Sequence, residues 1–175
     1  LIHARGPLDP EPLRRALQDL VDRHEALRTT FDAHGRYQSI WDRMAIDVPL
    51  RDVSGLPPRE AQAALEEVVA QAAEQPFDLE NGPLFRARLV KLAAAHHALI
   101  LTAHHLVVDG WSFGVLLEEM GRLYTARLTG AAASLPPPLA TRAYTRLAQE
   151  QLTPARIAAN RDYWLQQFAR LPDPL

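Results

Sequence analysis

The sequence predicts an α+β fold, a two-layer sandwich lobe in which helices pack on a mostly antiparallel sheet. Amphipathic helical patterns alternate with short β-compatible runs along the chain. Two of these runs, 84–92 and 97–105, flank the small-residue turn 93–96, which is typical of an antiparallel pair. The second run is apolar on both faces, as expected for a central strand that is covered on both sides.

The first helix is predicted from residue 10 to about His24. Asp9 suits the N-cap, and Pro10 suits the first helical position, where an N–H group would lack an intrahelical partner in any case. The apolar residues that follow recur at helical spacing. They are Leu13, Ala16, Leu17, Leu20 and Val21.

A β-hairpin and a second helix are expected next. Residues 27–31 and 37–41 are β-compatible and flank the turn-forming residues 32–35. Residues 47–53 look extended, and a Gly-Leu-Pro-Pro break separates them from a helix that ends before Pro76. The apolar face of that helix carries Ala61, Leu65, Val68, Val69 and Ala72.

The period becomes helical again after Gly110, and this helix is expected to end near Gly130. Its predicted apolar stripe is Phe113, Leu116, Leu117, Met120 and Leu123. Residues 135–138 predict a stiff surface connection, and Thr153-Pro154 predicts the start of a last helix. That helix carries Ile157, Trp164 and Phe168.

Composition excludes several classes of protein. The 175 residues are 47% hydrophobic, which favours a folded core, and the formal charge of -2 without a Lys/Arg block argues against nucleic acid as a partner. No apolar run reaches the ~20 residues that cross a bilayer and no secretory signal is recognisable, so a cytoplasmic protein without membrane contact is expected. The absence of cysteine excludes disulfides and a thiolate nucleophile. The start at Leu1 and the Pro-Asp-Pro-Leu end favour a fragment.

Titratable groups cluster in residues 104–112, where the second strand is expected to meet the following helix. That strand is expected to run through both His104 and His105. Neighbouring side chains of a strand point to opposite faces, so the two imidazoles cannot both address one ligand without distortion. Asp109 is a short acid that a turn readily employs, so a metal site is not expected here.

For an isolated histidine pair, the ordinary interpretation is one ring packed in the core, with Asp109 and Gly110 forming a turn. In this sequence, however, the residues around the pair favour a catalytic role. They combine two imidazoles, an acid four positions after His105, a glycine that permits close backbone approach, and a helix N-terminus with positive potential. Such a site suits holding an amine and stabilising negative charge on an acyl oxygen.

Residues 104–112 (HHLVVDGWS) resemble the HHxxxDG signature, followed by Trp-Ser, of nonribosomal peptide synthetase condensation domains. Residues 23–31 (RHEALRTTF) are similar to the RHExLRTxF motif of that family, and residues 76–86 (PFDLENGPLFR) to its PFDLxxGPLxR segment. Leu123-Tyr124 and Tyr163-Trp164 match weaker features. In this order the set is specific to condensation-type domains, although the opening Ser-x-x-Gln motif is absent.

The resemblance implies a chloramphenicol-acetyltransferase-like fold, in which residues 1–175 form the amino-terminal lobe of a condensation domain and the carboxy-terminal lobe is absent. In the complete domain, the active site lies in a tunnel between two lobes, so this chain alone is expected to be inactive. The expected partners are the donor and acceptor peptidyl carrier proteins, the carboxy-terminal lobe and a neighbouring adenylation domain. No directly bound cofactor is expected, since phosphopantetheine arrives on the carrier proteins.

The implied reaction is peptide-bond formation in nonribosomal peptide biosynthesis. The acceptor amine attacks the donor acyl thioester, and the donor carrier's thiol leaves. By resemblance, His105 is the catalytic residue. An α-amino group has a pKa of about 7.7–8.0 and needs no strong base. We therefore expect His105 to orient the amine and take or relay its proton, with general-base catalysis as the alternative.

The remaining site residues have supporting roles by the same interpretation. His104 is expected to be buried with a structural hydrogen bond. Asp109 is expected to hold the loop through an arginine, either Arg23 or an arginine of the absent lobe. Gly110 is expected to allow a tight turn, and the helix that begins with Trp111 and Ser112 to direct N–H groups toward the thioester.

Several other residues are assigned to the scaffold. Arg23 and Arg28, on either side of a helix end, are expected to be structural. Core packing is the expected role of Trp111, Met120 and Trp164, which lie on helical stripes. The His96-His97 pair beside the predicted strand turn is interpreted as incidental.

Three alternatives stay open. A related O-acyltransferase that forms esters uses the same histidine with an alcohol acceptor. An epimerisation domain shares the motif but moves a proton at the α-carbon. A noncatalytic docking domain recruits a carrier without turnover. A heterocyclisation domain is disfavoured, because the two histidines are not replaced by the acidic residues of that relative.

Overall fold

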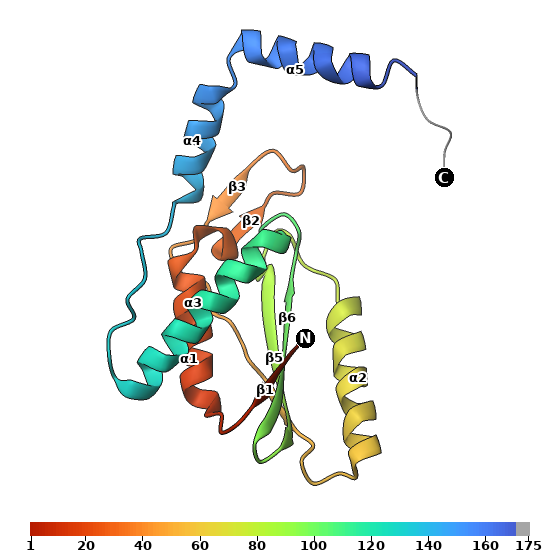
Figure 1. Cartoon of the computed structure of the whole chain (residues 1–175), viewed down its shortest axis with the longest axis vertical. Helices are drawn as coiled ribbons and strands as arrows, with labels where there is room; N and C mark the ends of the chain where they lie inside the picture. Colours follow the sequence, from red (N-terminus) through yellow and green to blue (C-terminus); the bar gives the residue numbers. More distant parts are fainter. Residues whose placement is uncertain (171–175) are drawn as a thin grey trace. The chain divides into compact units, whose positions relative to one another are not determined.

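In the computed structural model, which describes residues 1–170, the chain divides into two compact units (Figure 1). The first unit is Leu1–Pro138, and the second begins at Leu139. The Pro-Asp-Pro-Leu end that favoured a fragment, residues 172–175, lies outside the described residues.

The first unit is built on a four-stranded sheet with the order β1-β6-β5-β4. The strands are β1 (Ile2–Arg5), β4 (Leu50–Asp52), β5 (Phe85–Ala93) and β6 (His96–Ala103). β6 pairs antiparallel with both of its neighbours, whereas β4 pairs parallel with β5. The predicted α+β class with a mostly antiparallel sheet is thus confirmed, and β6 lies inside the sheet as its sequence indicated.

Helices cover both faces of this sheet. The larger hydrophobic cluster joins Leu99 of β6 to α1 (Pro10–Arg23) and α3 (Gly110–Thr129), while Ala98 and Ile100 pack with α2 (Pro58–Glu74). Figure 1 shows α2 on the opposite side of the strands from α1 and α3. Because β6 is apolar on both faces, both faces require a helical cover, and α2 therefore adds a layer to the predicted sandwich.

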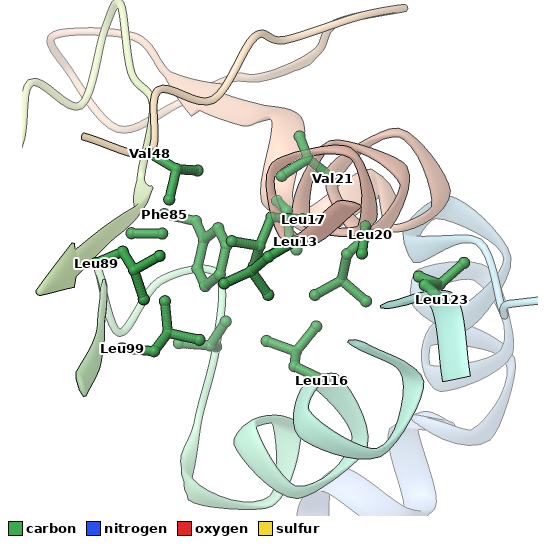
Figure 2. Packing of buried hydrophobic residues seen from close by; sticks show 14 residues of the cluster. Leu13, Leu17, Leu20, Val21, Val48, Phe85, Leu89, Leu99, Leu116 and Leu123 are labelled. Carbon is green, nitrogen blue, oxygen red and sulfur yellow. The ribbon is translucent and has the colours of Figure 1, made fainter. Parts of the chain in front are cut away.

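The larger cluster holds α1 and α3 against the sheet. Figure 2 shows Phe85, Leu89 and Leu99 of the strands facing Leu17 of α1, with Leu116 approaching from α3. The first four of these side chains are at most 3% exposed. Full burial of such a side chain contributes roughly 1.5–3 kcal/mol, so this layer fixes the place of α3, whose first turn follows the histidine motif.

The predicted hairpin is also present. A 3-10 turn, η1 (Glu25–Arg28), follows α1 and leads into β2 (Thr29–Phe31), which pairs antiparallel with β3 (Gln38–Ile40). Asp32 closes the turn by accepting the N–H groups of His34, Arg36 and Tyr37.

The predicted N-cap of α1 and the predicted end of α3 are both present. The Asp9 side chain accepts the Glu11 N–H at 3.1 Å, and Gly130 ends α3 in the left-handed conformation with φ 72°. Asp109, which was expected to hold the loop through an arginine, is instead the N-cap of α3. The predicted stripe of α3 requires correction, however. Leu117 is 36% exposed, and Trp111, which was assigned to the core, is 86% exposed.

The second unit contains α4 (Thr141–Gln151) and α5 (Pro154–Gln167). Thr153 caps α5 as predicted, but α4 was not predicted. Trp164 is 57% exposed, which contradicts its predicted place in the core. Its ring instead contacts Tyr163 and stacks on Phe168. Among the helices of residues 1–170, none is both long and apolar enough to span a membrane.

Candidate active site

The two histidines of the motif lie just beyond the end of β6, which stops at Ala103. The His104 N–H donates to the Leu84 carbonyl at 2.9 Å and makes the last backbone link to the neighbouring chain segment. Residues 105–107 then form a turn, in which the Val107 N–H donates to the His104 carbonyl at 3.0 Å. The expectation that both histidines alternate along a strand is therefore wrong, because the turn sets their directions.

His104 is half-buried and held through its side chain as well as its backbone. Its Nδ1 accepts the Leu106 N–H at 3.2 Å, so the ring proton resides on Nε2 in this arrangement. The imidazole meets Phe77 edge to face, with ring centroids 5.8 Å apart and an interplanar angle of 88°. The sequence pattern did not identify Phe77 as a neighbour of this site.

His105 differs from His104 in that its side chain is exposed. It projects from the turn between β6 and α3, next to Leu106, which is itself 55% exposed. The imidazole is therefore accessible from solvent within the described residues.

Asp109 organises the start of α3 through a capping box with Ser112. Asp109 Oδ1 accepts the Ser112 N–H at 2.8 Å and its hydroxyl at 2.6 Å, and the Asp109 N–H donates to Ser112 Oγ at 3.2 Å. The bonds from the hydroxyl and from the N–H of Ser112 lower the pKa of Asp109, and the charge of His105 adds to this effect. Asp109 and Ser112 thus fix the first turn of the helix that follows His105.

Arg23 does not reach Asp109. Its Nε donates to Glu119 Oε2 at 2.9 Å, and a second nitrogen, Nη2, donates to Oε1 at 3.3 Å. Arg23 also donates to the carbonyl of Pro136, beyond the end of α3. Arg23 is therefore not the arginine that pairs with Asp109, because Glu119 and Pro136 hold its guanidinium elsewhere.

Glu119 is the acidic residue that sequence reasoning missed. It is 9% exposed and also contacts His24 Nε2 at 2.7 Å. Burial by itself raises the pKa of Glu119, but the hydrogen bonds from Arg23 and His24 outweigh it and lower the pKa overall. A signal was present in the sequence, since Glu119 falls three positions after Leu116 and four before Leu123 on the apolar face.

Arg28 and Gly110, the two remaining predicted residues, lie in different parts of the fold. Arg28 donates to the carbonyl of Trp41 and so ties η1 to the end of β3. Gly110 is the first residue of α3, and its φ lies outside the left-handed region. A Cβ placed on Gly110 meets nothing within 4 Å, so the expectation that the chain needs glycine there for a tight turn is wrong.

Within residues 1–170, no group of three or more metal-ligating side chains comes together. The arrangement is instead an exposed imidazole on a short turn, followed at once by the capped N-terminus of a 20-residue helix. The positive end of a helix dipole stabilises nearby negative charge. This geometry is suited to proton transfer next to a developing oxyanion.

Comparison with known proteins identifies a consistent set of relatives. The model of the condensation-domain family matches residues 1–174. Chondramide synthase cmdD of Chondromyces crocatus is 38% identical over 167 residues, which cover 94% of this chain and 4% of that protein. Phosphinothricin tripeptide synthetase PhsB of Streptomyces viridochromogenes is 35% identical over 170 residues, which cover 95% of this chain and 14% of that protein.

Two solved structures share the fold. SgcC5 from Streptomyces globisporus superimposes with a TM-score of 0.82 and 28% identity over 94% of this chain and 38% of its own. The starter condensation domain of rhizomide synthetase RzmA, as the R148A mutant in complex with C8-CoA, gives a TM-score of 0.87 and 26% identity over 98% of this chain and 40% of its own. The chain thus spans well under half of each of these relatives.

Proposed function

This chain belongs to the condensation-domain family of nonribosomal peptide synthetases, and we propose that it supplies the histidine side of a site that forms an amide bond. The acceptor is the amine of an aminoacyl thioester on one peptidyl carrier protein, and the donor is an acyl or peptidyl thioester on another. The observation that carries the proposal is the exposed imidazole of His105 on the turn before the capped helix α3.

Residues 1–175 correspond, in this proposal, to the amino-terminal lobe of the condensation domain. The support is that the superposition on the RzmA condensation domain includes 98% of this chain but only 40% of the RzmA chain. The carboxy-terminal lobe then provides the opposite wall of the site. A wall that excludes water strengthens electrostatic interactions with the reacting atoms.

His105 orients the acceptor amine and takes or relays its proton. The amine nitrogen forms a bond to the thioester carbonyl carbon, which places negative charge on the oxygen of a tetrahedral intermediate. The carbon–sulfur bond then breaks, and the thiol of the donor carrier's phosphopantetheine leaves with a proton. Because α3 begins at Gly110, its N-terminal end lies close in the chain to His105 and favours charge on the oxygen.

The test is His105→Ala in the complete domain, with carrier-bound donor and acceptor. We expect amide product to disappear while the circular dichroism spectrum and Tm stay unchanged, because the His105 side chain is exposed. His34→Ala, an exposed histidine in the β2–β3 turn, is the matched control and retains activity. Undiminished amide product from His105→Ala would refute the proposal.

A second candidate, ester formation with an alcohol acceptor, has one observation in its favour. The structure of SgcC5 contains (R)-(-)-1-(2-naphthyl)-1,2-ethanediol, which carries two hydroxyl groups. The same imidazole serves either acceptor, since it needs only to hold and deprotonate a nucleophile. Competition between amine and alcohol acceptors, with the products separated by mass spectrometry, distinguishes amide from ester formation.

A further inference from the structure

The segment 76–86 folds back toward the histidine motif through contacts of its own. Asp78 accepts the N–H groups of Glu80 and Asn81, which closes a turn. Gly82 follows with φ 69°, and a Cβ there would lie 3.2 Å from a side-chain carbon of Met44. The turn is thus tightly packed, and it brings both ends of the segment close to the start of β5.

Arg86 holds the first end of this segment in two ways. Its Nη1 and Nη2 donate to the carbonyls of Gln75 and Pro76 at 3.2 and 2.8 Å. Its guanidinium carbon also lies 4.3 Å from the centroid of the Phe77 ring. A guanidinium at this distance attracts an aromatic face, so Arg86 fixes both the backbone before Phe77 and the ring itself.

Phe77 in turn contacts His104. The two rings meet at 88° with their centroids 5.8 Å apart, which is a favoured edge-to-face arrangement. His104 also forms hydrogen bonds with Leu84, Leu106 and Val107, through its N–H, Nδ1 and carbonyl in turn. Leu106 and Val107 belong to the turn that carries His105, so the rotation of the His104 ring and the path of that turn are linked.

We infer that Phe77, held by Arg86, is a positioning residue for the proposed acyl transfer. Its ring keeps the His104 imidazole rotated so that Nδ1 faces the Leu106 N–H, and this contact sets the turn from which His105 projects. The inference rests on the proposed function for its effect on turnover. The contacts that link Arg86, Phe77 and His104 do not depend on the proposed function.

The direct test uses Phe77→Leu in the complete domain. Leucine keeps an apolar side chain but removes the aromatic ring that meets the imidazole. We expect kcat to fall by about ten- to a hundredfold with KM for both loaded carriers within about twofold, because a small misplacement of a reacting group lowers the rate more than binding. Phe77→Tyr keeps the ring and is expected to retain kcat.

A second measurement does not depend on turnover. Nitrogen-15 NMR of the histidine rings is expected to show His104 protonated on Nε2 in the unaltered domain, and mixed Nδ1 and Nε2 protonation in Phe77→Leu. If the unaltered domain forms neither amide nor ester, the proposed function fails, while the NMR result still tests the positioning by Phe77. Unchanged kcat or an unchanged His104 tautomer in Phe77→Leu would overturn the inference.

Two further variants separate positioning from loss of stability. Val68→Ala removes methyl groups from the hydrophobic cluster in which α2 packs with Ala98 and Ile100 of β6. It is expected to lower Tm without changing kcat or the His104 tautomer. An equal fall in kcat in Val68→Ala would contradict a positioning role. Because Arg86 acts through Phe77, Phe77→Leu combined with Arg86→Gln is expected to lose no more kcat than Phe77→Leu alone. Fully additive losses would contradict this order of action.

Discussion

Two carboxylates on α3 have different partners and different surroundings. Asp109 is exposed at the N-cap and bonds to Ser112, whereas Glu119 is buried nearly three turns further on and bonds to Arg23 and His24. The first holds the beginning of the helix, next to His105. The second holds the middle of the helix to the end of α1.

Replacement of Asp109 tests the cap. Asp109→Ala removes the acceptor of the Ser112 N–H and is expected to lower the free energy of unfolding by about 0.5–2 kcal/mol, measured by urea denaturation. Activity is expected to fall as well, since the first turn of α3 adjoins His105. Asp109→Asn keeps a capping oxygen and is expected to recover most of the stability. Equal losses in both variants would argue against a capping role.

The lowered pKa of Glu119 predicts that the stability of the fold depends on pH. Its pKa in the folded chain is lowered from the ordinary value of 4.5, so the unfolded chain binds its proton more readily. The stabilisation of the folded state by the ionised Glu119 side chain is therefore complete above about pH 4.5. It is lost as the pH falls through the lower pKa that Glu119 has in the folded chain. Thermal unfolding between pH 3 and 7 measures this loss.

Glu119→Gln is the matched variant for that experiment. At pH 7 it leaves Arg23 and His24 without a carboxylate, and we expect a loss of about 1.5–3 kcal/mol, typical of hydrogen bonds to charged groups. The difference in Tm between the unaltered chain and Glu119→Gln is expected to narrow below about pH 4.5. A constant difference across this range would exclude the assigned ionisation of Glu119.

At the scale of elements, the packing of α3 on α1 decides where the motif helix lies. Leu116 is 4% exposed and belongs to the larger cluster, while its neighbour Leu117 is 36% exposed. Successive residues of a helix are separated by about 100° around its axis, so only one of the two faces the core.

This pair provides a matched test within one helix. Leu116→Ala is expected to lower the free energy of unfolding by about 2–5 kcal/mol, because it removes buried methyl groups and leaves a cavity. Leu117→Ala is expected to change it by no more than about 0.5 kcal/mol, as for most surface substitutions. Chemical denaturation of both variants measures the contrast. Similar losses would show that both leucines are buried in the folded protein.

At the scale of the whole molecule, the exposure of His105 predicts that the chain needs further parts of the protein for catalysis. Within residues 1–170, the turn that carries His105 is open to solvent. An amine held there is not shielded from water, and the electrostatic stabilisation of an oxyanion is correspondingly weak.

We therefore expect residues 1–175 alone to form no amide from carrier-bound donor and acceptor, whereas the complete domain forms it. Mass spectrometry of the acceptor carrier measures the product. Circular dichroism of the isolated chain is the control for folding, because an unfolded chain would be inactive for a trivial reason. Amide formation by the chain alone, at the rate of the complete domain, would contradict the proposed need for a second lobe.

Much of the fold was predictable from local pattern, and some elements show why. The N-cap of α1 at Asp9 and the end of α3 at Gly130 follow from residue types that suit those backbone positions. In contrast, α4 was missed because no side chain caps its start and no proline stands in its first turn. The helices α1, α2 and α5 each have such a proline, which marked where they begin.

The amino-acid sequence by itself determined the helical and strand periods, the order of the elements apart from β1 and α4, and the motif that contains His105, because these depend on neighbours only a few positions apart. Only the tertiary structure decided that β6 ends at Ala103, that Arg23 pairs with Glu119, and that Phe77 meets His104. Arg23 and Glu119 are separated by 96 positions. Contacts of that kind depend on how the helices and the sheet pack, and no local pattern encodes them.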